Sequence, residues 1–157
     1  HFNDLEDLAA TAISRQFAVV APFFDAPSRE GDLTHRVDSI VDQRVALAAR
    51  MHHLARAAAY HAVSSPTIST TVADRRRLLR RQVEEQFAPE LRTRRGRPRA
   101  RLLAQLDHAL SLEALDYLSD PTGSGLHERE LRLAVRSQVV ALLRNALSPT
   151  LTVSLDR

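Results

Sequence analysis

Apolar residues recur at spacings of three and four along almost the whole chain, which is the repeat of an α-helix that buries one face. No stretch alternates apolar and polar residues for long, as a half-buried strand would, and glycine occurs only four times. The pattern therefore predicts an all-α fold, a helical bundle of about five main helices. We expect these helices over residues 4–21, 33–62, 65–88, 99–118 and 127–147.

Capping residues and prolines mark several ends of the expected helices. Asp32 is suited to begin the second helix because its side-chain oxygen accepts a hydrogen bond from a free backbone N–H group. Ser65 followed by Pro66 is a typical start for the third helix, and Pro89 is expected to end it. The expected connections are a loop over 25–31, a basic linker over 92–101 and a turn over 120–126.

The composition excludes several classes of site. Cysteine is absent, which excludes disulfides, thiolate metal sites and a thiol nucleophile. No apolar run approaches the roughly 18 residues that span a bilayer, so we expect a cytoplasmic protein with no membrane partner. All 22 basic residues are arginine, but the net charge is only +3. The arginine runs at 75–77, 80–81 and 92–101 are therefore expected to be solvated surface and not a nucleic-acid site.

The last two expected helices carry more apolar surface than one buried face requires. A helix that is apolar on more than one side is buried on more than one side, and the spare side most simply meets a second copy of the chain. We expect a homodimer with a four-helix interface built from the last two helices of each copy. The residues predicted at its centre are Leu112, Leu115, Val140, Leu143 and Leu147. The alternative is that both helices are central in a monomeric bundle.

Two charged residues fall on faces that are otherwise apolar, Arg44 on the second helix and Asp107 on the fourth. Either they satisfy each other, or Arg44 reaches solvent by its long stem, or they line a pocket and orient a polar ligand. If Asp107 forms an ion pair with Arg44, we expect the pocket to prefer a neutral ligand. If it does not, we expect an anionic ligand. The candidate pocket residues are Arg44, Met51, His52, Phe17, Phe87 and Asp107. For the two phenylalanines, a place in the core is the other interpretation.

The sequence contains no recognisable catalytic or metal-binding motif. Di-iron bundles need a glutamate three residues before a histidine on facing helices, and no histidine here has one. His52 and His53 are adjacent, which is not the spacing of two ligands on one helix face. No Gly-rich phosphate loop, nucleophile elbow or zinc-protease motif occurs. The sequence therefore predicts a protein that is not an enzyme, with no catalytic residue, metal site or cofactor.

The first eight residues, His-Phe-Asn-Asp-Leu-Glu-Asp-Leu, resemble the junction that ends the DNA-binding head of TetR-family transcriptional regulators. In that family an aromatic pair or a His-Phe pair follows the recognition helix. A short polar turn comes next, and then a helix that opens with an acidic residue and leucine. Phe2, Leu5, Glu6 and Leu8 match this pattern, with the helix expected to begin at about Asp4. The all-helical body and the final pair of helices strengthen the resemblance.

The resemblance implies that residues 1–3 end the DNA-binding head and that residues 4–157 are the ligand-sensing and dimerisation domain. The helix-turn-helix that binds operator DNA would precede His1, so no residue of this chain is assigned to DNA. An unidentified small-molecule effector would control a homodimeric, repressor-type protein, with the first helix carrying the signal to the head. The alternative is a helical dimerisation or partner-binding module without a ligand. A buried cavity in the helical body, walled by the first four helices, would favour the sensor, and a solid core would favour the module.

Overall fold

The computed structural model describes the backbone of residues 2–147 and, within that range, all side chains except those of residues 2–6, 9, 10, 14, 20 and 147. The described residues form helices and no strand, which confirms the all-α prediction. None of these helices is long and apolar enough to pass through a bilayer. In chain order the elements are α1 (Phe2–Val20), the 3-10 turn η1 (Ala21–Phe24), α2 (Leu33–His61), α3 (Pro66–Gln86), α4 (Ala88–Arg92), α5 (Gly96–Ala109), α6 (Leu112–Ser119) and α7 (Glu128–Leu147).

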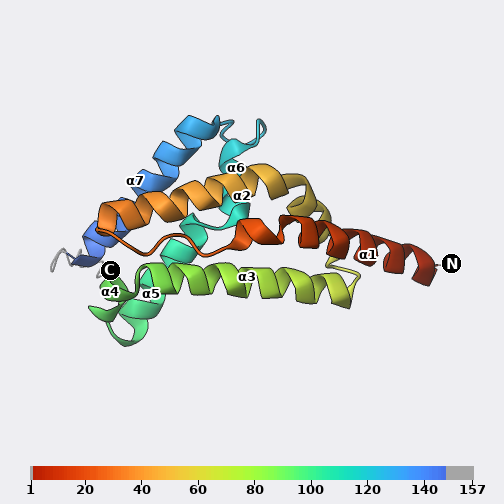
Figure 1. Cartoon of the computed structure of the whole chain (residues 1–157), viewed down its shortest axis with the longest axis horizontal. Helices are drawn as coiled ribbons and strands as arrows, with labels where there is room; N and C mark the ends of the chain where they lie inside the picture. Colours follow the sequence, from red (N-terminus) through yellow and green to blue (C-terminus); the bar gives the residue numbers. More distant parts are fainter. Residues whose placement is uncertain (1, 148–157) are drawn as a thin grey trace, which may run out of the picture.

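The longest helix, α2, is the centre of the bundle, and α1, α3, α6 and α7 all pack against it. Helix α3 runs back along α2 in the opposite direction, and α1 lies against both, with its N-terminal part extending beyond the rest of the bundle (Figure 1). Helix α5 packs against α3 and α7, and α6 packs against α2 beside α7. Of the helices longer than ten residues, α1, α3 and α7 contact α2 directly, and α5 is linked to it through α3 and α7.

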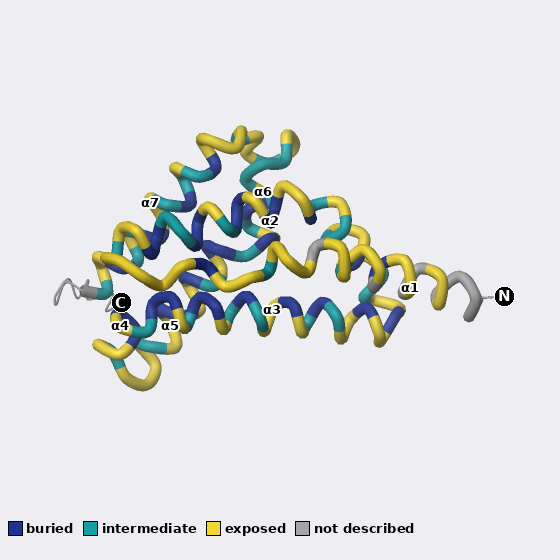
Figure 2. Tube along the Cα trace, viewed as in Figure 1, coloured by how far each residue is buried: buried dark blue, intermediate teal, exposed yellow. Residues whose placement is uncertain are grey.

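Two apolar clusters hold the helices together. The larger lies between α2, α3, α5, α6 and α7, and its members include the fully buried Phe87, Leu106 and Leu115. The smaller joins α1 to α2 and α3, and consists of Ile13, Ala58, Ile68 and Val72. Each large apolar side chain in these clusters contributes roughly 1.5–3 kcal/mol. Buried residues follow the inner faces of α2 and α3, whereas most described residues of α1 are exposed (Figure 2).

The starts of α2 and α3 are formed by the caps that the sequence predicts. Asp32 accepts a hydrogen bond from the backbone N–H of His35 at 2.8 Å, and Ser65 accepts one from Ile68, with a proline in the first turn. Helices α2, α3 and α7 keep their expected ranges to within two residues at each end. The first helix differs, because it already includes Phe2. The polar turn expected before residue 4 is therefore not present.

The prediction of one continuous helix over 99–118 is wrong, because the chain breaks in front of Ser111 into α5 and α6. The side chain of Ser111 accepts a hydrogen bond at 3.1 Å from the backbone N–H three residues later, which begins a new helix. After the break, Leu112 and Leu115 pack in the same core as Leu106. The apparent excess of apolar surface in this stretch is thus used inside the chain.

The basic linker expected over 92–101 is also shorter than predicted. Pro89 does not end a helix; it lies in the first turn of α4, where its missing N–H has no partner to lose. Helix α5 then begins at Gly96, whose φ of +57° is a left-handed conformation that glycine adopts without steric cost. Only residues 93–95 separate the two helices.

Candidate functional site

A cavity of about 620 Å³ opens between α2, α6, the turn over 120–126 and the start of α7; we call it the larger cavity. Its volume lies in the range of small-molecule sites, roughly 300–1,000 Å³. Buried apolar side chains form its floor, and polar side chains form its mouth. The floor consists of Val45, Ala48, Met51, Leu112 and Leu131.

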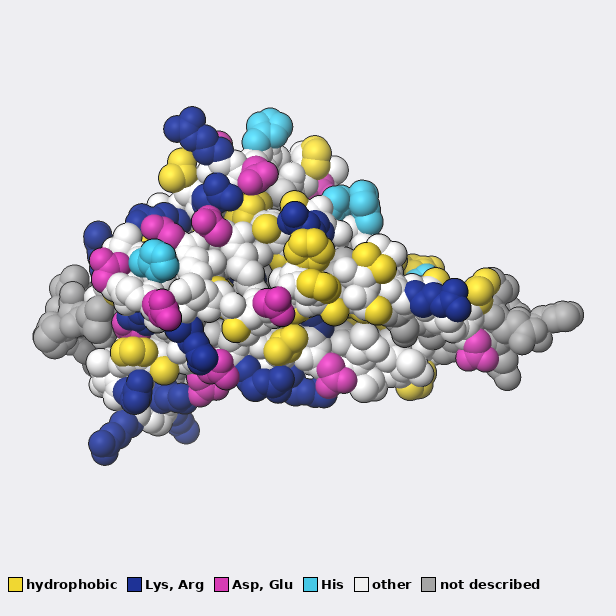
Figure 3. All heavy atoms as spheres, viewed as in Figure 1, with side chains coloured by type: hydrophobic (Ala, Val, Ile, Leu, Met, Phe, Trp, Pro, Cys, Tyr) yellow, Lys and Arg dark blue, Asp and Glu magenta, His cyan; other side chains and the backbone are white. Residues whose placement is uncertain are grey.

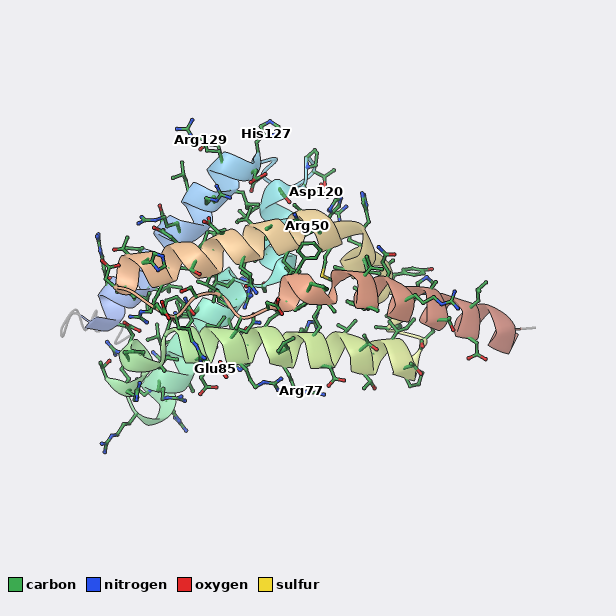
Figure 4. The ribbon with its side chains drawn as sticks, viewed as in Figure 1. Arg50, Arg77, Glu85, Asp120, His127 and Arg129 are labelled. Atoms are coloured by element: carbon green, nitrogen blue, oxygen red, sulfur yellow. The ribbon has the colours of Figure 1, made fainter. Side chains whose placement is uncertain are left out.

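Arg56 of α2 bridges the mouth of the larger cavity to α6 and its C-terminal cap. Its Nε donates to Asp116 at 2.8 Å, and its Nη2 donates to Asp120. Asp120 lies at the end of α6, next to α2 (Figure 4). The ion pairs of the other two carboxylates at the mouth are Glu113–Arg76 and Glu128–Arg132. Each carboxylate that lines the larger cavity therefore has an arginine partner, and the mouth has little uncompensated negative charge.

These ion pairs strengthen the charged forms of both partners. Hydrogen bonds from the side chain and backbone of Thr122, and then from Arg56, lower the pKa of Asp120 from 3.8 to about 2. Hydrogen bonds to Asp116 and Asp120 raise the pKa of Arg56. The bridge between α2 and α6 is therefore fully charged at neutral pH.

Gly123 is required by the close turn that borders the larger cavity. A Cβ placed on Gly123 would lie 2.2 Å from the backbone oxygen of Tyr117, a distance that no real Cβ contact permits. The backbone N–H of Gly123 donates to the carbonyl of Asp120 at 2.9 Å. This tight turn holds Pro121 and Leu126 in the cavity wall.

A second cavity, of about 350 Å³, lies between α3 and the junction of α5 with α6; we call it the smaller cavity. Its charged lining residues are the arginines Arg44, Arg75, Arg76 and Arg80 and the carboxylates Asp107 and Glu113. Leu112 and Glu113, in the first turn of α6, line both cavities. The two cavities are thus neighbours that differ in the charge of their walls.

Arg44 is completely buried and is held by neutral acceptors. It donates to Gln82 Oε1 at 2.8 Å, to the carbonyl of Leu79 at 3.0 Å, and to Gln43. Burial lowers its pKa to about 10, and the nearby charge of Asp107 opposes this shift. Asp107 itself accepts a hydrogen bond from Arg80 at 2.8 Å. The interpretation in which Asp107 directly pairs with Arg44, and the one in which Arg44 reaches solvent, are therefore both wrong.

The structure divides the predicted pocket residues between three places. Met51 and His52 line the larger cavity, whereas Arg44 and Asp107 line the smaller one. Phe87 is fully buried and Phe17 half-buried in the apolar clusters, and neither lines either cavity. The expectation of a single pocket that holds Arg44 together with Met51 and His52 is therefore wrong. The walls agree with expectation only in part. The second helix and α6, which belongs to the expected fourth helix, line the larger cavity, but so does α7, and no described residue of α1 or α3 lines it.

Most residues predicted at the centre of a dimer interface lie elsewhere. Leu112, Leu115 and Leu143 are covered by the chain's own core, with at most 3% of each exposed. A second copy cannot contact them without displacing that core. Val140 is half-buried and packs against the core, and the side chain of Leu147 lies outside the described residues. Among the described side chains of α7, the large apolar residue that is exposed is Leu133, at 49%.

Sequence reasoning missed Arg56, Asp116 and Asp120 at the larger cavity and Arg75 at the smaller one. Asp116 lies in α6, whereas Asp120 is its C-cap and begins the turn that the sequence predicts over 120–126, so helical spacing gave no signal that the two share a partner. Their partner Arg56 is 60 residues away from Asp116 along the chain, so no local pattern could identify it. Arg75 is one of three successive arginines, and its burial depends on the packing of α3.

Comparison with protein-family models, with curated proteins and with solved structures finds no match for this chain. Among the described residues, no group of three histidine, aspartate or glutamate side chains is placed to hold a metal ion. The two cavities are therefore the features from which a function is argued.

Proposed function

We propose that this chain is the ligand-sensing and dimerisation domain of a TetR-type transcriptional regulator, and that the larger cavity binds its effector. The observation that carries the proposal is a small-molecule-sized cavity with an apolar floor in an all-helical body. The sequence resemblance at residues 1–8 supplies the family. Because the carboxylates at the mouth are already paired with arginines, the cavity favours a neutral, mainly apolar ligand over a charged one.

The position of α2 suggests how a ligand would act. One face of α2 forms part of the floor of the larger cavity, and the same helix packs against α1 and α3. A ligand that fits between α2 and α6 best at one separation shifts the population toward that separation. Through the contacts of α2 with α1, such a shift would reach the N-terminal end of the chain, where the resemblance places the DNA-binding head.

Ligand binding is tested with the neutral apolar dye Nile red and a pair of alanine variants on α2. Ala55 lines the larger cavity, whereas Ala57 is exposed and lies outside it. Ala55→Phe should obstruct part of the cavity and weaken the rise in dye fluorescence, and Ala57→Phe should leave it unchanged. Equal dye binding by the two variants would refute the assignment of the cavity and favour a module without a ligand.

The regulatory part of the proposal is tested on the gene. The codons ahead of His1 should encode a helix-turn-helix, and the protein that includes it should bind DNA near its own gene. Residues 1–157 alone should not bind DNA specifically, because sequence readout needs an element placed in a groove. A gel-shift assay in competitor DNA at physiological salt measures both. A coding sequence that lacks a helix-turn-helix ahead of His1 defeats the TetR assignment.

The homodimer remains part of the proposal, but its centre moves to the outer face of α7. Leu133 and Val140 are seven residues apart, which places them on one side of the helix. A stable interface of this kind buries on the order of 1,200–2,000 Å². Sedimentation should give a dimer for the wild type and a monomer for Leu133→Glu, with Leu8→Glu, at another exposed leucine, still dimeric. A monomeric wild type across the micromolar range contradicts this.

A further inference from the structure

Arg75 is a buried cation whose donors are mostly unused. Its side chain is only 5% exposed, and its Nη2 lies 3.3 Å from Glu113 Oε1. Its Nε and Nη1 are covered, and no acceptor among the described residues lies within hydrogen-bonding distance of either. A buried donor without an acceptor costs about 1–3 kcal/mol, and more when it is charged. The wall of the smaller cavity therefore contains buried, charged donor groups that would be stabilised by a hydrogen-bond acceptor.

The carboxylates of the smaller cavity do not accept hydrogen bonds from the Nε and Nη1 of Arg75. Asp107 is bonded to Arg80, and Glu113 accepts its shortest hydrogen bond, at 2.8 Å, from Arg76. The Nε of Arg44 also has no acceptor among the described residues. Burial lowers the pKa of Arg44 and of Arg75, and the charges of the nearby Asp107 and Glu113, respectively, offset this lowering only in part.

Elsewhere the chain does provide a buried arginine with a carboxylate. Arg36 donates to both oxygens of Glu90, at 3.1 and 2.5 Å, and to the carbonyl of Gln86 at 2.6 Å. That arrangement satisfies the guanidinium as a two-pronged pair. Arg75 has no such two-pronged carboxylate partner among the described residues, and it borders the open space of the smaller cavity instead.

We propose that the smaller cavity binds a small anion, a carboxylate or phosphate group, with Arg75 as its principal donor and with Arg44 and Arg76 beside it. The guanidinium fork matches the oxygens of either group. The volume of about 350 Å³ is at the lower end of the range for small-molecule sites. This site is distinct from the effector cavity and does not depend on the regulator assignment.

The carboxylate of Glu113 would compete with a bound anion for the guanidinium of Arg75. Its side chain is 49% exposed, and its Oε1 takes hydrogen bonds from both Arg75 and Arg76. A bound anion would take the place of this oxygen on Arg75 Nη2 as Glu113 turns toward solvent. Because Glu113 also lines the larger cavity, its movement would alter the mouth of that cavity as well.

The proposal predicts opposite effects for two substitutions, measured by titration calorimetry with sodium phosphate and, separately, sodium acetate at ionic strength held constant with chloride. Arg75→Met should weaken anion binding about tenfold or more, because it removes charge-assisted hydrogen bonds. Glu113→Gln should strengthen it severalfold, because it removes the competing charge. Arg77→Met is the control, since Arg77 is exposed and points away from the bundle (Figure 4); it should bind like the wild type.

The two anions separate the two sources of the ligand group. Binding of phosphate alone assigns a phosphorylated ligand, and binding of acetate alone assigns a carboxylic acid. If neither anion gives a heat of binding at millimolar concentration, the proposal is overturned. Equal weakening by Arg75→Met and Arg77→Met also overturns it, and would indicate general attraction by the arginine-rich edge along α3 and α5 (Figure 3). If Arg75→Met does not fold, Glu113→Gln carries the test, and unchanged or weaker binding by that variant overturns the proposal.

Discussion

The larger and smaller cavities share the first turn of α6 but differ in where their charged side chains lie and in how these are paired. The larger cavity has an apolar floor, and its charged side chains are at the mouth, where each carboxylate has an arginine. The smaller cavity has arginines in its buried wall, and two donor nitrogens of Arg75 have no acceptor among the residues that the structure describes. This difference is the basis for proposing a neutral ligand at the first cavity and an anion at the second.

The arginines of the two cavities show the physical cause of this difference. Arg56 has a half-exposed side chain, and hydrogen bonds to two carboxylates raise its pKa. Arg44 is buried among neutral acceptors, and the loss of solvation lowers its pKa to about 10. The same side chain is therefore well satisfied at one site and short of a counter-charge at the other.

The largest effect that tests the comparison is a charge in the floor of the larger cavity. Met51→Glu should destabilise the fold by about 3–5 kcal/mol, because it buries a carboxylate without a partner. His53→Glu, at an exposed position on the same cavity, should change the free energy of unfolding by no more than about 0.5 kcal/mol. Urea denaturation of the two variants measures the contrast. Similar losses would show that the floor is not an apolar environment.

A smaller effect should separate the two buried arginines of the smaller cavity. Arg44→Met should cost about 1–3 kcal/mol, because it leaves Gln82 and the carbonyl of Leu79 without their donor. Arg75→Met should be neutral or slightly stabilising, because it removes a buried charge whose donors are mostly unused. Urea midpoints with unchanged slopes check both values. A larger loss of stability for Arg75→Met than for Arg44→Met would contradict the view that the donors of Arg75 are unsatisfied without a ligand.

Sequence alone predicted the parts of the fold that depend on local signals. The caps at Asp32 and Ser65 placed the starts of α2 and α3 correctly, because capping involves only the next few residues. The break before Ser111 was missed, because serine is also tolerated within a helix and its role as a cap depended on how α5 and α6 pack. Reading one helix through this point also made Leu112 and Leu115 look like spare apolar surface.

The candidate sites were predicted only in part, for a related reason. The apolar neighbours of Arg44 in its helix correctly marked its position as buried, but its partner Gln82 is 38 residues away. The same holds for Asp107, whose partner Arg80 is on another helix. Helical periodicity assigns a residue to a face, but it does not say which residue of another helix it meets. The division of the predicted residues between two cavities therefore required the structure.

The smallest effect concerns the exposed ion pairs at the mouth of the larger cavity, and it appears as a pH dependence. The pKa of Asp120 is lowered in the folded chain from 3.8 to about 2, so the folded state holds the charged form more strongly than the unfolded state does. Its contribution to stability is therefore complete above pH 3.8 and is lost as the pH falls toward 2. Asp120→Asn should flatten the fall in melting temperature over this window. Thr122→Val, which removes one of the hydrogen bonds to Asp120, should flatten it less. Circular dichroism melts between pH 2 and pH 5 measure the three profiles, and a wild-type profile identical to that of Asp120→Asn would mean that the pairing at the mouth has no energetic consequence.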